Sequence, residues 1–100
     1  MTTQRMLTPE DFQPWVGKKV KVNTAPQPVE VTLERIETVP RFTQELDFRQ
    51  PFSLFFEAPL DVFLLDLAYE FDCGRGGPHS IFISQCPPLP NRRVYQAAFN

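Results

Sequence analysis

The chain is poor in the residues that most often supply chemistry or cross-links. Its 100 residues include one histidine, two cysteines and four glycines. Metal sites in small proteins use closely spaced ligand pairs, because two ligands on one turn converge on a point. The residues that could form such a set are Asp72, Cys73, His79 and Cys86. Their thiol and imidazole groups are too widely spaced in the sequence to form a close ligand pair. We therefore expect no metal and no other cofactor, and we expect both thiols to behave as small core residues.

The chain also lacks a large excess of charge of either sign. Ten Lys and Arg residues stand against twelve Asp and Glu residues, which gives a formal net charge of −2. Nucleic-acid binding requires enough positive charge to displace counterions from phosphates. Short basic groups over 18–21 and 92–93 form no continuous stripe. The balance excludes nucleic acid as an expected partner.

Long hydrophobic runs are absent. The longest run covers 62–65 and is bounded by Asp61 and Asp66, whereas a membrane-spanning helix needs about 20 apolar residues. The opening residues 1–5 lead into no apolar segment of the kind found in signal peptides. The sequence thus predicts a cytoplasmic protein without a membrane partner.

Aromatic residues and proline are abundant. Ten phenylalanines, two tyrosines and one tryptophan can fill the core of one small domain, and eleven prolines fall mostly at segment borders. Between those borders apolar and polar residues alternate, which is typical of half-buried strands. A phase slip near Glu34 and Arg35 predicts a β-bulge. Strands are expected over 18–22, 29–34, 51–57, 67–73, 80–85 and 93–99.

One short helix is expected near the start. Thr8 can cap it and Pro9 suits its first position, while Pro14 ends it after one or two turns. Phe12 and Trp15 are spaced to point the same way and to plug one end of the core. The fold class is mainly β: a single small antiparallel β-barrel or rolled β-sandwich of six to seven strands with one short N-terminal helix.

The domain organisation follows from these segments. Residues 1–7 are expected to be a flexible lead-in, and 8–100 a single β domain. A long connection is predicted over 41–50, with or without a helical turn. Pairing of 67–73 with 80–86 would place the two cysteines about 20 Å apart at 3.3 Å per residue, which argues against a disulfide.

Four stretches carry a resemblance to a known family. They are LTPEDF at 7–12, PFSLFF at 51–56, IFI at 81–83 and YQAAFN at 95–100. With them the chain resembles a bacterial family of roughly hundred-residue proteins classed as a domain of unknown function. The resemblance implies no reaction. It also implies an association with phage-tail-like or tail-fibre gene contexts.

The surplus of apolar residues leads to the first functional hypothesis, a non-enzymatic module for protein interaction or assembly. Phe52, Leu54 and Phe56 share one strand face and are expected in the core, which leaves Phe55 on the other face. The run at 63–65 cannot be buried on one side either. Phe55, Phe63 and Leu65 are therefore candidates for a partner or self-association surface. Alternatively, the helix or the 41–50 connection covers them.

Two other hypotheses remain open. A barrel mouth lined by Trp15, Tyr69 and Tyr95 would bind a small ligand. A hydrolase centred on His79 would need a carboxylate to orient the imidazole and a nucleophile close by, for which Ser80, Ser84 and Cys86 are sequence neighbours. A solvated loop histidine is the favoured interpretation of His79, because a catalytic site needs more than residues adjacent in sequence.

Overall fold

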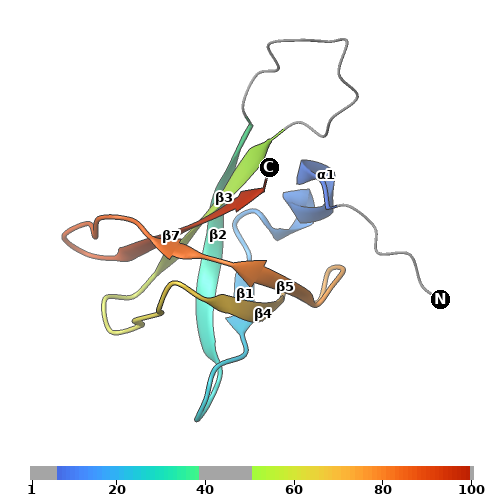
Figure 1. Cartoon of the computed structure of the whole chain (residues 1–100). Coiled ribbons are helices and arrows are strands. Elements are labelled where there is room, and N and C mark those ends of the chain that lie inside the picture. Colours follow the sequence, from blue (N-terminus) through green and yellow to red (C-terminus); the bar gives the residue numbers. More distant parts are fainter. Residues whose placement is uncertain (1–6, 39–50, 100) are drawn as a thin grey trace.

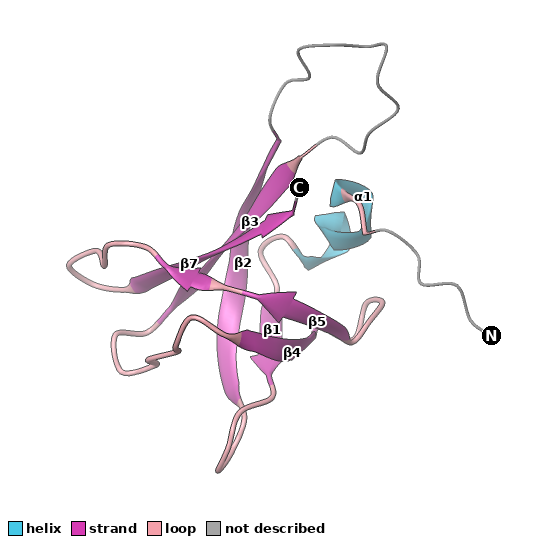
Figure 2. Ribbon diagram, viewed as in Figure 1, coloured by secondary structure: helices cyan, strands magenta, loops and turns pink. Residues whose placement is uncertain are grey.

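The computed structural model describes residues 7–38 and 51–99. Seven antiparallel strands curl into a half-barrel, and one short helix lies near the N-terminal end (Figures 1 and 2). The predicted fold class is confirmed. The elements, in chain order, are α1 (Pro9–Phe12), the 3₁₀ turn η1 (Gln13–Trp15), β1 (Lys19–Val22), β2 (Val29–Thr38), β3 (Phe52–Ala58), β4 (Ala68–Asp72), β5 (His79–Phe82), β6 (Ser84–Gln85) and β7 (Arg93–Phe99).

The order of strands across the sheet is β5-β4-β1-β2-β3-β7-β6. Its two outermost strands, β5 and β6, are consecutive in the chain and are separated only by Ile83. One chain segment therefore pairs with β4 through its first part and with β7 through its second part. This shared segment connects the two ends of the curled sheet.

The bulge predicted in the second strand is confirmed. The register of β2 with β3 shifts between Leu33 and Arg35. Leu33 is fully buried and Ile36 packs against the core. In a regular strand, one outward-facing residue separates two core-facing residues. Because a bulge adds one residue, two outward-facing residues separate Leu33 from Ile36.

The core fills the inner side of the curl. Phe52, Leu54 and Phe56 are at most 1% exposed, as the alternation in β3 predicts. Phe12 and Trp15 are fully buried, and their rings lie 5.1 Å apart in an edge-to-face arrangement. The segment of α1 and η1 that carries them begins at a turn in which the Thr8 amide donates a hydrogen bond to the Asp11 carboxylate, at 2.7 Å.

Two details of the sequence-based prediction are wrong. The strand expected over 80–85 divides at Ile83, where the chain changes partner from β4 to β7. The register also differs: Phe71 pairs with His79, whereas pairing of the near ends of 67–73 and 80–86 would join Cys73 to Ser80. Leu67 precedes β4 and is 49% exposed.

The burial of the cysteines also differs from expectation. Both are free, and both are half-buried rather than fully enclosed in the core. The predicted connection over 41–50 and residues 1–6 of the lead-in predicted over 1–7 lie outside the described residues. In the part of the chain that is described, no helix is long and apolar enough to cross a membrane.

Candidate functional site

A loop between β3 and β4, residues 60–67, is held by side chains from other elements; we call it the anchored loop. The hydroxyl of Tyr95 accepts a hydrogen bond from the Leu64 amide at 2.9 Å and donates one to the Val62 carbonyl at 2.8 Å. Tyr95 is 1% exposed and Leu64 is 4% exposed. Since water is excluded there, breaking these bonds would leave buried polar groups unpaired.

Further contacts fix both ends of the anchored loop. The Arg93 Nε donates to the Leu60 carbonyl at 2.6 Å. The Gln85 side-chain amide donates to the Leu64 carbonyl at 3.1 Å, and the Gln85 backbone amide donates to the Asp66 carboxylate at 3.0 Å. The Asp66 contact also satisfies an outward-facing N–H of the short strand β6, which limits pairing at that edge.

Tyr69 supplies another anchor. Its hydroxyl accepts from the Leu65 amide at 3.1 Å and lies 3.3 Å from the Leu65 carbonyl oxygen, to which it can donate. Tyr69 and Tyr95 therefore hold adjacent residues of the loop from two different strands. Among the described residues, this stretch of the loop has no ladder partner, and side-chain hydrogen bonds take the place of a sheet.

Large apolar side chains of the anchored loop nevertheless face solvent. Phe63 is 55% exposed and Leu65 is 57% exposed, whereas Leu64 between them is buried. We call the exposed members the loop surface: Leu60, Phe63, Leu65 and Leu67. Phe82, 57% exposed, lies on β5 opposite Ala68, the residue that follows the loop.

A hollow of about 490 Å³ adjoins the anchored loop. It lies between 61–65 of the loop and the turn from β1 to β2. Of the three residues expected to line a ligand site, Tyr69 does so, whereas Trp15 and Tyr95 are buried in the core. The lining consists of Asn23, Thr24, Ala25, Pro26, Gln27, Val29, Asp61, Val62, Phe63, Leu64, Leu65 and Tyr69.

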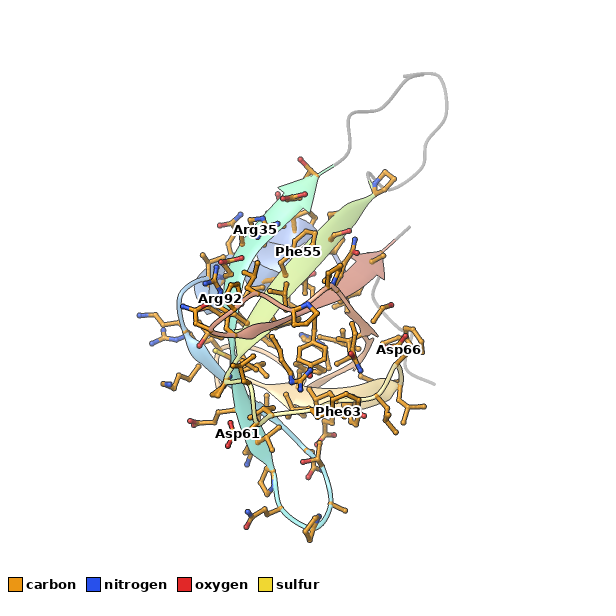
Figure 3. All side chains as sticks on the ribbon, turned by 90° about the vertical axis from the view of Figure 1, so that its left-hand side faces the viewer. Arg35, Phe55, Asp61, Phe63, Asp66 and Arg92 are labelled. Atoms are coloured by element: carbon orange, nitrogen blue, oxygen red, sulfur yellow. The ribbon has the colours of Figure 1, made fainter. Side chains whose placement is uncertain are left out.

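Phe55 lies elsewhere. It is on the outer side of β3, away from the core, and Figure 3 places it apart from Phe63. The Arg35 guanidinium lies 4.1 Å from the centre of its ring and leaves Phe55 half-buried. Arg35 also pairs with Glu37 at 2.7 Å. The structure therefore brings Phe63 and Leu65 together on one loop but separates Phe55 from them.

A second group of charges occupies the same outer face. The Arg92 Nε lies 2.9 Å from the Glu57 carboxylate, and its NH2 group lies 3.5 Å from the Glu34 carboxylate. A smaller hollow of about 350 Å³ beside it is lined in part by Glu57 and Arg92. Because the opposite charges lie in contact, this face presents little net charge to a partner.

His79 packs as an aromatic side chain. Its ring stacks on Trp15 with centroids 5.8 Å apart and meets the edge of Phe12 at 5.5 Å. Within residues 7–38 and 51–99, no hydrogen bond or ion pair joins His79 to a carboxylate. Burial raises the pKa of the Cys86 thiol, which disfavours the reactive thiolate. The geometry therefore lends the hydrolase hypothesis no support.

Metal-binding side chains do not gather in the described segments. No group of three or more His, Cys, Asp or Glu residues there is placed to hold an ion. Sequence reasoning missed the loop anchors, Tyr69, Gln85, Arg93 and Tyr95. Tyr69 and Tyr95 were identified as aromatics but not as hydrogen-bonding residues, because alternation does not indicate which backbone groups a tyrosine hydroxyl reaches.

Comparison with known proteins gives a family but no activity. No curated protein and no solved structure matches the chain. A family model described as a domain of unknown function, DUF6916, matches residues 7–99. The match includes every described strand, the anchored loop and the hollow. The chain belongs to this family, DUF6916.

Proposed function

We propose that the protein is an interaction module that binds a protein partner through the loop surface. The observation that carries the proposal is the combination of exposure and anchoring. Phe63 and Leu65 are each more than half exposed, yet the backbone between and beside them is fixed by Tyr69 and Tyr95. A loop that only connects two strands requires neither exposed apolar side chains nor a backbone fixed by side-chain hydrogen bonds.

Exposed apolar groups carry a free-energy cost that binding can recover. Burial of apolar area contributes about 25 cal/mol per Å², and clustered apolar side chains on a soluble domain mark interaction surfaces. An ordered loop also loses less conformational entropy when it binds. The anchored loop therefore presents its apolar side chains in a form ready for a partner.

The test compares partner capture by matched variants. The tagged protein is used to recover cross-linked proteins from its native host, alongside the double variant Phe63→Ser/Leu65→Ser. Val16→Ser is the control, because Val16 is also exposed, at 38%, but lies outside the anchored loop. We expect one protein to be recovered by the wild type and by Val16→Ser, to be lost with the double variant, and to bind directly when both are purified.

Retention of that protein by the double variant would overturn the proposal. Sedimentation of the purified chain separates self-association from binding to another protein. If the partner is a second copy, the wild type sediments as a dimer and the double variant as a monomer. Unfolding midpoints of all three proteins verify that the substitutions leave the fold intact.

A second candidate function is small-ligand binding, which the hollow favours. Its volume of about 490 Å³ lies in the range of about 300–1,000 Å³ usual for ligand sites. A metabolite that raises the unfolding midpoint of the wild type, but not that of Asn23→Ala, would support this function. Equal effects on both proteins would count against it.

A further inference from the structure

The charge of the hollow limits what it can accept. Among the described residues that line the hollow, Asp61 is the one acidic residue, and none is Lys or Arg. Within the described residues, the Asp61 carboxylate has no hydrogen-bond or ion-pair partner. A phosphate or carboxylate ligand would therefore meet an uncompensated negative charge, whereas a cation would meet a free acceptor.

The aromatic lining favours the same kind of group. Phe63 and Tyr69 are among the residues that line the hollow, and aromatic ring faces attract ammonium and guanidinium groups. Phe63 already has such a contact in the chain itself, because the Arg93 guanidinium lies 5.1 Å from its ring centre. Asn23 and Gln27 also line the hollow, and the amide oxygens of such side chains can accept hydrogen bonds from N–H donors.

The hollow and the loop surface are continuous. Phe63 and Leu65 belong to both, and Figure 3 shows Asp61 and Phe63 on the same loop. A chain that packs on these two apolar side chains can extend a neighbouring side chain toward Asp61. We infer that the hollow receives a lysine or arginine side chain of the protein partner, next to apolar residues that contact the loop surface; this inference rests on the proposed function.

The test begins with peptides, since the partner is a protein segment of stated chemistry. A library of random peptides displayed on phage is selected on the immobilised full chain, and peptides that also bind Phe63→Ser/Leu65→Ser are removed. We expect the remaining peptides to carry Lys or Arg beside apolar residues. Affinities are then measured by fluorescence polarisation for the best peptide and for its neutral analogue, with norleucine for lysine or citrulline for arginine.

Asp61→Asn is the decisive variant. One exposed ion pair contributes up to about a five-fold change in affinity, so we expect Asp61→Asn to weaken the basic peptide about three- to five-fold and to leave the neutral analogue unchanged. Glu10→Gln is the control, because it removes an exposed carboxylate from α1, outside the hollow, and we expect it to change neither affinity.

Each contrary outcome has a distinct meaning. Peptides that need Phe63 and Leu65 but carry no basic residue, or that bind Asp61→Asn as tightly as the wild type, overturn the inference and leave the proposed function standing. If no peptide depends on Phe63 and Leu65, both are overturned. Equal losses for the basic peptide and its neutral analogue would assign Asp61 a structural role and also overturn the inference.

Discussion

The Tyr95 hydroxyl lies 2.9 Å from the amide nitrogen of Leu64, a residue 31 positions earlier in the chain. The contact joins the middle of β7 to a loop that has no ladder partner of its own. The same hydroxyl reaches the Val62 carbonyl. One side chain of the core thus orders the backbone on both sides of the exposed Phe63.

The first prediction concerns this hydroxyl. Tyr95→Phe keeps the ring but leaves the buried Leu64 amide without its acceptor. An unsatisfied buried group costs about 1–3 kcal/mol, and we expect the free energy of unfolding, measured by denaturant titration, to fall by that amount. Tyr69→Phe is the comparison; its hydroxyl lies in a more exposed contact, so its loss should be smaller. Equal stability of Tyr95→Phe and wild type would contradict the assignment.

The second prediction concerns the helix as a plug. Phe12 is fully buried against Trp15 and Phe52. Phe12→Ala should therefore lower the free energy of unfolding by about 3–5 kcal/mol. Phe82→Ala removes the same ring from a position that is 57% exposed, and its effect should stay within about 0.5 kcal/mol. A loss of unfolding free energy for Phe12→Ala as small as that for Phe82→Ala would show that the plug contributes little to stability.

The third prediction is a loss of stability in alkali. Burial raises the pKa of the Tyr95 phenol above its ordinary value of 10.0. The folded state therefore keeps a proton that the unfolded state releases, so the stabilisation is complete below pH 10 and declines as pH rises above it. Burial also raises the pKa of the Cys73 and Cys86 thiols above 9.0, which adds a decline of the same sign from about pH 9.

Unfolding titrations between pH 8 and pH 11 check this direction. Tyr95→Phe should show a shallower decline above pH 10 than the wild type, because it lacks the phenol. The variant in which both cysteines are serine should lose the part that begins near pH 9. A wild-type stability that rises over this interval would contradict the sign.

The fourth prediction concerns the outer face. Glu57 and Arg92 form an ion pair at 2.9 Å with both side chains about one-third exposed. Pairs of this kind contribute at most about 1 kcal/mol. We expect Glu57→Gln to lower the free energy of unfolding by no more than that, and the difference from wild type to shrink in 1 M salt. A larger, salt-independent loss would indicate a different role for the carboxylate.

Alternation in the sequence was sufficient to predict most strands. Buried and half-buried residues alternate strictly along β3, as the spacing of Phe52, Leu54 and Phe56 predicts. It could not reveal that the segment after His79 changes partner at Ile83. Ile81 and Ile83 are both buried, so the period of two continues unbroken through the change. Periodicity records which face a residue occupies, not which strand lies beside it.

The candidate site was predictable only in part. A run of apolar residues too long for one buried face identified Phe63 and Leu65. The hydrogen bonds of Tyr69 and Tyr95 were not predictable, because a strand pattern assigns a tyrosine to the inner face without indicating where its hydroxyl ends. The alternation in β3 also predicted that Phe55 points away from the core. Its contact with Arg35 was not predictable, because it depends on the bulge in β2, which places the two residues opposite each other.

Amide hydrogen exchange at Leu64 tests most directly whether the loop is held in a fixed form. The account predicts that this amide exchanges slowly in the wild type, although it lies outside any strand, and that Tyr95→Phe accelerates its exchange more than that of amides in the β2–β3 ladder. Rapid exchange of the Leu64 amide in the wild type, at the rate of an unstructured peptide, would contradict the account.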